Sequence, residues 1–283
     1  MNESAITRGT LERAEVHTDW LNDFYTDESR AFYESAFDHI AQVFGSRRKS
    51  TVLDAGCGAG SNTIRLALRG YPVLAMDVSE HILERARVNV AATDLSHMVT
   101  FEHGSVSSLP LQDRSLDFVI CWNVLMLIPE IETAISELCR IVRPGGFLVI
   151  SEDNMWSLEA LLVRCAHRIL DDTGLMRGRA SYRPTITAAG AEYVHRTEAG
   201  PLFGRVARIS WLVKTVASHG FELKERLGGE FLESKAVPGK PLKRCIRKFN
   251  LLWFEHVRLP HPSMGNVLIF EKRMGARKRS AGD

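Results

Sequence analysis

The chain has 283 residues and a formal net charge of +2, with 45% hydrophobic and 25% charged residues. This composition is typical of a globular protein and excludes a fibrous, disordered or miniature disulfide-stapled one. No apolar run reaches the roughly 18 residues of a membrane span, and the polar N-terminus does not resemble a secretory signal, so we expect a cytoplasmic protein. The five cysteines are widely spaced and form no CxxC pair, which predicts reduced thiols and no metal site.

Residues 1–48 are expected to form an N-terminal helical lid or flank, because apolar residues recur at helical spacing from Asp19 to Phe44. The strand-like run Thr51 to Asp54 then ends in three glycines at positions 56, 58 and 60. A helical pattern from Ser61 to Arg69 follows at once. The order predicted here is strand, tight glycine turn, helix.

The same alternation continues across residues 49–152, the predicted ligand-binding core. Further strands are expected at 72–77, 99–103, 116–121 and 146–150, and helices at 81–90 and 131–141. Two more strands are expected at 221–226 and 265–272. Strands that alternate with helices predict an α/β fold with a doubly wound, mostly parallel, seven-stranded sheet, Rossmann-like in kind.

Insertions interrupt this rhythm after the fifth strand. Residues 153–203 are expected to form a substrate cap, with a helix from Met155 to Leu170 and then a loop-like stretch rich in Gly, Arg and Thr. Residues 204–273 begin with a predicted helix from Arg205 to His219 and complete the sheet around a basic insertion at 228–262. The tail at 274–283 is polar and expected to be disordered.

The glycine turn marks the expected ligand site, since ligands of open parallel sheets bind at the carboxyl ends of the strands. Glycines let a backbone approach a ligand closely, and the next helix offers free N–H groups. Asp54 and Asp77 end two successive strands. A carboxylate at the position of Asp77 can accept both ribose hydroxyls, while Asp54 beside the turn would repel a pyrophosphate and attract an ammonium. A nucleoside with a cationic amino-acid tail is therefore favoured over a dinucleotide.

Five blocks, in order and spacing, resemble the motifs of class I S-adenosylmethionine-dependent methyltransferases, of the small-molecule, type 11-like kind. They are Val52–Gly60, Leu74–Ser79, Gly104–Pro110, Leu116–Cys121 and Leu138–Gly146. The resemblance covers about residues 50–152. It implies that S-adenosylmethionine is the cofactor and S-adenosylhomocysteine the product.

The resemblance also implies roles for individual residues. Asp54 would place the ammonium, the backbone of Gly56, Cys57 and Gly58 would pass the methionine part, and Asp77 would bind the ribose. The adenine would lie between Val78 and Val106, beside a loop that contains Gly104 and Ser105, and the backbone at Cys121 and Trp122 would line the sulfonium. Ser105 stands where the family often has an acid, which predicts a weaker contact with the adenine amino group.

The acceptor is expected to be a small molecule, such as a natural product, a glycan or a quinone- or lipid-like compound, with oxygen the favoured nucleophile. The segment Cys121–Val124 does not match the tetrad of nucleic-acid amino methyltransferases, so nucleic acid is not an expected partner. No catalytic base stands out, and Glu152, Asp153, His195 and His256 are all candidates. The alternative is a noncatalytic partner or regulatory protein that keeps the fold.

A basic segment carries the only hint of a further contact. Residues 235–279 contain 12 Lys or Arg and two Glu, and at 240–258 the basic residues alternate with apolar ones. Such an amphipathic helix can rest on an anionic membrane or hold an anionic substrate. The plainer interpretation, which we favour, is a lid helix with its apolar face in the core and its charges in water.

Overall fold

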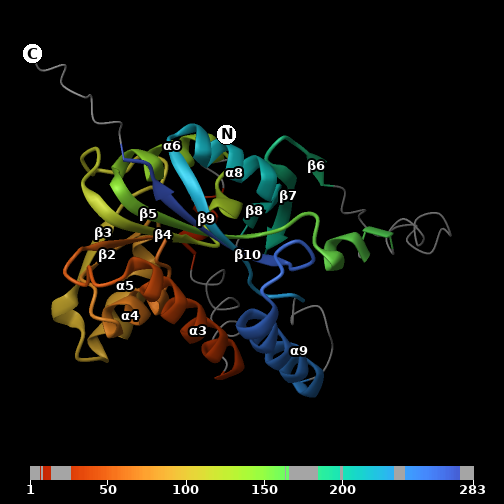
Figure 1. Ribbon diagram of the computed structural model, residues 1–283, viewed down its shortest axis with the longest axis horizontal. Helices are drawn as coiled ribbons and strands as arrows, with labels where there is room; N and C mark the ends of the chain where they lie inside the picture. Colours follow the sequence, from red (N-terminus) through yellow and green to blue (C-terminus); the bar gives the residue numbers. More distant parts are fainter. Residues whose placement is uncertain are drawn as a thin grey trace, which may run out of the picture.

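The computed structural model describes residues 7, 9–13, 27–162, 164–165, 184–197, 200–232 and 240–274 (Figure 1). Its helices are α3 (Asp27–Phe44), α4 (Ser61–Leu68), α5 (Glu80–Ala91), α6 (Ile131–Ile141), α8 (Ile209–Ser218) and α9 (Lys240–Leu252), with short helical turns η1 (Ser96–Met98), η2 (Leu125–Leu127) and η4 (Trp253–Val257). Its strands are β1 (Val52–Ala55), β2 (Val73–Asp77), β3 (Val99–His103), β4 (Leu116–Trp122), β5 (Val142–Asp153), β6 (Thr185–Ile186), β7 (Gly190–Thr197), β8 (Gly200–Ala207), β9 (Phe221–Gly228) and β10 (Gly265–Lys272).

Seven of these strands form one sheet in the order β3-β2-β1-β4-β5-β10-β9. The pairs from β3 to β5 are parallel, whereas β10 runs antiparallel to both β5 and β9. The doubly wound, mostly parallel seven-stranded sheet predicted from the sequence is thus confirmed. Since β1 lies between β2 and β4, the order of connection reverses there, and a ligand site is expected at the carboxyl ends of these strands.

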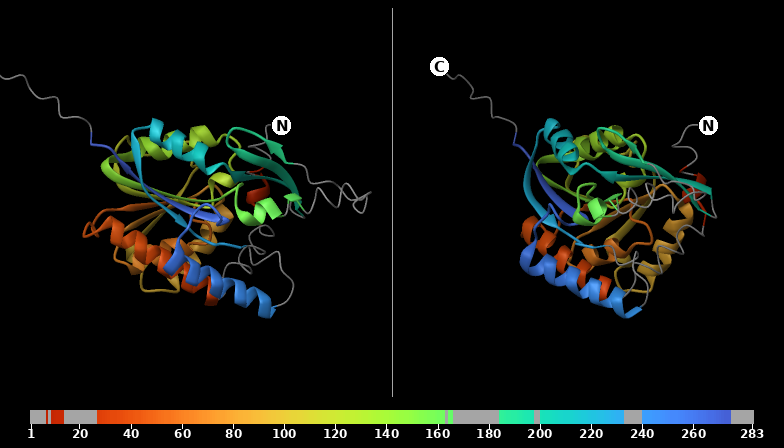
Figure 2. Two further views of the ribbon diagram at one scale, coloured as in Figure 1. Left: turned by 45° about the vertical axis from the view of Figure 1, so that its right-hand side comes forward. Right: turned by 90° about the vertical axis from the view of Figure 1, so that its right-hand side faces the viewer.

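Helices cover both faces of the sheet, with α6 and α8 on one side and α3, α4 and α5 on the other (Figure 2). Strands buried on both faces need apolar side chains at nearly every position. In β1, Val52 packs into the core beneath α3, and Leu53 packs into the core beneath α6. Helix α3 is held by Phe44, whose ring stacks on Phe118 of β4 at 4.0 Å between centroids.

The insertion after β5 differs from the prediction. Instead of a loop-like stretch, residues 185–197 and 200–207 contain the strands of a second, antiparallel sheet in the order β6-β7-β8. The predicted helix start at Arg205 is wrong, because Arg205 to Ala207 pair with β7 and the helix begins only at Ile209. Backbone pairing across the hairpin overrides the helical pattern of this segment. Of the predicted helix at 155–170, residues 158–162 and 164–165 are helical, and 166–170 lie outside the described residues.

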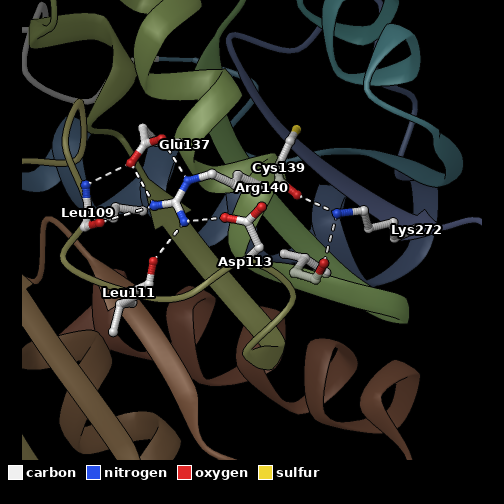
Figure 3. Close-up of polar contacts among 8 residues, drawn as sticks. Leu109, Leu111, Asp113, Glu137, Cys139, Arg140 and Lys272 are labelled. Atoms are coloured by element: carbon white, nitrogen blue, oxygen red, sulfur yellow. Dashed lines mark hydrogen bonds and ion pairs between the residues drawn. The ribbon is translucent and has the colours of Figure 1, made fainter.

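Arg140 of α6 organises the loop that follows β3 (Figure 3). Its guanidinium donates to the carbonyls of Leu109 and Leu111 at 3.0 and 2.7 Å and to the carboxylates of Glu137 and Asp113 at 2.8 Å. At the same, C-terminal end of the helix, the Lys272 ammonium donates to the carbonyls of Cys139 and Val142 (Figure 3). The planar fork of an arginine suits several acceptors at once, so Arg140 fixes the loop against α6.

Within the part of the chain that the structure describes, no helix combines the length and the apolar character needed to cross a bilayer. The tail predicted to be disordered falls, except for Met274, outside the described residues.

We expect Arg140→Lys to lower the free energy of unfolding by about 1–2 kcal/mol, because a lysine keeps the charge but cannot bond the two carbonyls and two carboxylates together. Urea denaturation measures the change. Arg143→Lys is the matched control, since Arg143 is 50% exposed and its ion pair with Asp117 should contribute little. Equal losses in the two variants would contradict the role given to Arg140.

Candidate functional site

The glycine turn after β1 is folded back onto β2. The amides of Gly56 and Cys57 both donate to the carbonyl of Met76, at 2.8 and 2.9 Å. Gly56 has a φ of +76°, and a Cβ at this position would collide with the side chain of Val124. Gly58, with a φ of +54°, has no atom within 4 Å of where its Cβ would be. The turn therefore needs glycine at 56 for close packing, and at 58 it borders open space.

Asp77 is held at the end of β2 by backbone amides. Its Oδ2 accepts the Gly58 amide at 2.9 Å, and its Oδ1 accepts the Ser79 amide at 3.0 Å. Each carboxylate oxygen has more than one lone pair, so the two amides orient the carboxylate and leave acceptor capacity for a ligand. The carboxylate thus links the glycine turn to the second strand at the edge of the sheet.

A cavity of about 270 Å³ lies at this edge. Eight of the eleven residues predicted to bind the cofactor line it: Gly56, Cys57, Gly58, Asp77, Val78, Ser105, Val106 and Trp122. They come from the ends of β1, β2 and β4 and from the loop after β3, which is the place expected from the topology.

The other three residues predicted to bind the cofactor lie behind the cavity wall. Asp54 is buried and accepts a 2.6 Å hydrogen bond from Thr63 Oγ1, and burial raises its pKa to about 6. The Gly104 amide donates to the Asp77 carbonyl, and Cys121 packs into the core. Burial raises the pKa of both Cys57 and Cys121, which makes them poor nucleophiles. The proposed roles of Asp54, Gly104 and Cys121 at the cofactor stay predictions.

Helix α3 and the start of α4 contribute cavity residues that the sequence analysis did not single out. Tyr33 lines the cavity, with its ring 5.7 Å from that of Trp122 and the Arg65 guanidinium 4.8 Å from its centroid. Burial, followed by the charge of Glu230, raises the pKa of Tyr33, so its hydroxyl stays protonated at neutral pH. Tyr33 lies one helical turn before Phe37, so the periodicity of α3 could have placed it on the inward face.

The four candidate bases are dispersed. Glu152 is buried at the end of β5 outside the cavity lining, and its neighbour Asp153 is half-buried. The side chain of His256 is 70% exposed on η4. The side chain of His195, on β7, lies outside the described residues. Asn123, just beyond β4, does line the cavity, and its Oδ1 accepts a hydrogen bond from Ser151 Oγ at 3.2 Å.

Arg205 connects the second sheet to the cavity wall. This side chain on β8 is 2% exposed, and it donates to the carbonyls of Leu125, Ile128 and Pro129 at 3.2, 2.8 and 3.0 Å. Its Nε donates to Glu192 of β7 at 2.9 Å. Ile128 and Pro129 line the cavity, so a buried cation from the insertion holds this part of the wall in place.

Part of the chain is similar to known proteins. Residues 53–150 match the family described as a methyltransferase domain. The chain is 31% identical over 137 residues to a 27-O-demethylrifamycin SV methyltransferase of Amycolatopsis mediterranei, covering 47% of this chain and 50% of that protein. It is 36% identical over 113 residues to a demethylmenaquinone methyltransferase of Clavibacter sepedonicus, covering 40% and 43%. The chain thus spans about half the length of these relatives, or less.

The fold is also that of a solved methyltransferase structure. Magnesium protoporphyrin IX methyltransferase of Synechocystis, determined with bound S-adenosylhomocysteine, superposes with a TM-score of 0.61 at 17% identity. The superposition covers 95% of this chain and 99% of that one. At this identity the likeness establishes the Rossmann-like methyltransferase fold.

The buried Glu152 should give the protein a distinctive pH dependence. Burial, aided by the charge of Asp153, raises its pKa to about 8 from 4.5. Folding therefore takes up a proton between these two values, and the free energy of unfolding falls as pH rises through this window. Glu152→Gln removes this effect. Relative to the parent protein, we expect the variant to gain stability progressively from about pH 5 to 8, by a few kcal/mol in all.

Urea denaturation at a series of pH values measures this gain. Glu132→Gln, an exposed substitution on α6, should reproduce the slope of the parent protein. A parallel slope for Glu152→Gln and the parent would contradict the raised pKa.

Proposed function

We propose that the protein binds S-adenosylmethionine and methylates a small-molecule acceptor, since residues 53–150 match the family described as a methyltransferase domain. The observation that carries the proposal is the Asp77 carboxylate, oriented by the Gly58 and Ser79 amides at the rim of the cavity. A carboxylate in this place suits the two hydroxyls of a ribose, because charged hydrogen bonds contribute roughly 1.5–3 kcal/mol each.

The remaining wall fits the other parts of this cofactor. Val78 and Val106 offer apolar surface for an adenine, and the Ser105 hydroxyl lies beside them. The open space at Gly58 leaves room for the amino-acid tail next to the backbone. Asp54, behind the wall, would act on the ammonium through its charge and through the turn that it braces with Thr63. Backbone at Cys121 and Trp122 would border the sulfonium.

When bound, this cofactor supplies an electrophilic methyl group on a sulfonium. The charge disappears during the transfer, so the protein has mainly to align the acceptor and exclude water. Trp122, Asn123 and Tyr33 are the cavity residues placed to do this. Tyr33 can donate a hydrogen bond to an acceptor oxygen but is not a base at neutral pH, because its pKa is raised. Asn123 can accept or donate through its amide.

We propose oxygen as the nucleophile, on a natural product, a glycan or a quinone- or lipid-like acceptor. The name of one relative supports oxygen, since its substrate is a 27-O-demethyl compound. The name of another, which acts on a demethylated menaquinone, supports a quinone-like acceptor without indicating the nucleophile. The cavity lining also favours such an acceptor, because Leu127, Ile128 and Pro129 give it an apolar side.

Calorimetric titration with S-adenosylhomocysteine tests the cofactor. We expect micromolar binding by the parent protein and binding weaker by roughly tenfold or more in Asp77→Asn, since an amide cannot replace the charged acceptor. Asp94→Asn, an exposed substitution after α5, is the matched control and should bind as the parent does. NADH should not bind. If the folded parent protein binds no S-adenosylhomocysteine, the result would favour the alternative of a noncatalytic partner or regulatory protein that keeps the fold.

Turnover tests the nucleophile. The protein is incubated with S-adenosylmethionine and with panels of phenols, hydroquinones, sugars, amines and thiols, and formation of S-adenosylhomocysteine is followed by mass spectrometry. We expect product only with the hydroxyl compounds, and roughly tenfold less of it in Asp77→Asn at a subsaturating cofactor concentration. Methylation confined to the amines or thiols would overturn oxygen as the nucleophile while leaving the cofactor assignment intact.

A further inference from the structure

Helix α9 presents apolar side chains to solvent. Leu242, Phe249 and Leu252 are 48%, 43% and 55% exposed, and their spacing places them on one side of the helix. The buried Asn250 lies on the inward side. The lid helix expected from the sequence, with its apolar face in the core, is therefore found only in part, because Leu251 packs against the core while these three side chains face solvent. We call Leu242, Phe249 and Leu252 the outer stripe.

The orientation of α9 is fixed by its inward contacts. The Asn250 side chain accepts the amides of Phe231 and Leu232 at 3.1 and 3.2 Å and donates to the Leu232 carbonyl at 2.9 Å. The helix also packs along α3, on the outer side of the molecule (Figure 2). The outward position of the stripe is thus a consequence of specific hydrogen bonds and packing.

Positive charge accompanies the stripe. Helix α9 contains Lys240, Lys243, Arg244, Arg247 and Lys248 and no acidic residue. Arg244 and Lys248 are exposed and follow one border of the stripe on the helix surface. Apolar side chains beside cations, on a helix that faces outward, are typical of helices that lie in a membrane interface.

A second exposed apolar helix adjoins α9 through one segment. Leu158, Leu161 and Leu162, on the helical stretch that starts at 158, are 43%, 40% and 59% exposed. The Leu158 amide donates to the Pro262 carbonyl at 3.1 Å, and Trp253 Nε1, just after α9, donates to Ser263 Oγ at 2.9 Å. The segment 262–263 therefore contacts both the start of this helical stretch and the turn that follows α9.

We propose that α9, together with the helical stretch at 158–162, docks the protein on an anionic lipid surface. A helix that lies at the boundary of such a surface places the leucines and the phenylalanine toward the hydrocarbon and Arg244 and Lys248 toward the phosphate groups above it. An acidic protein partner would complement the positive charge but would give the outer stripe no apolar surface to pack against. The proposal concerns a surface outside the cavity and stands whether or not the protein is a methyltransferase.

Cosedimentation of the full chain with vesicles tests the proposal. Vesicles of phosphatidylcholine with equimolar phosphatidylglycerol are compared with vesicles of phosphatidylcholine alone. We expect binding to the anionic vesicles to be at least about tenfold tighter and to weaken in about 0.5 M NaCl. Leu242→Gln with Leu252→Gln, and Arg244→Glu with Lys248→Glu, should each lower the affinity at least about fivefold.

Matched control variants replace the same kinds of side chain, apolar and basic, at exposed positions outside α9. Leu68→Gln with Val88→Gln removes two apolar side chains that are each 63% exposed, on α4 and α5. Lys49→Glu with Arg85→Glu changes the net charge equally, at two exposed positions. Both controls should bind anionic vesicles as the parent does, and thermal melts confirm folding.

Three outcomes would overturn the proposal. These are no preference for anionic vesicles, equal losses in the control variants, and a parent protein that self-associates without binding vesicles but becomes monomeric in Leu242→Gln with Leu252→Gln. The last result would assign the outer stripe to a second copy of the chain.

Discussion

The bonds from the Gly56 and Cys57 amides to the Met76 carbonyl are the interaction on which the site depends. They draw the turn after β1 across the end of β2, so that the next helix starts beside the second strand. Gly58 can then donate to Asp77, and Gly56 can lie against Val124 without a side chain between them. A Cβ at 56 would separate the turn from the wall beyond β4. The open space in this region is therefore produced by backbone packing.

Two arginines hold other parts of the cavity wall through contacts with residues distant in the sequence. Arg140 holds the loop after β3 from the α6 side, and Arg205 holds the 125–129 segment from the second sheet. Both donate to backbone carbonyls, which are acceptors that every loop has in any sequence. Loops at the carboxyl edge of a sheet are otherwise its least constrained part. Buried or half-buried guanidinium groups thus give these loops a defined position.

The polar groups behind the wall have a different character. Asp54 and Glu152 are both buried, with pKa values raised to about 6 and about 8. Asp54 has Thr63 as a partner, whereas the backbone amides of Leu125 and Met126 approach the Glu152 carboxyl without a close hydrogen bond to either oxygen. Burial of a carboxyl that is so weakly bonded is unfavourable in the ionised form. The Glu152 carboxyl is therefore mostly protonated at neutral pH.

The sequence by itself determined the seven-stranded sheet and the glycine turn with Asp77, because strand, turn and helix signals are local and the spacing between Gly60 and Asp77 is short. It did not reveal the β6–β8 sheet, since the stretch before Gly200 is loop-like in composition and the pairing of Arg205 to Ala207 with β7 competes with a helical pattern in those residues. Nor did it reveal Tyr33 or Arg65 at the cavity, which come from helices packed against the sheet. The outward face of α9 was decided only by tertiary structure. An amphipathic pattern gives two faces, and only the contacts of Asn250 and the packing on α3 decide which of them meets water.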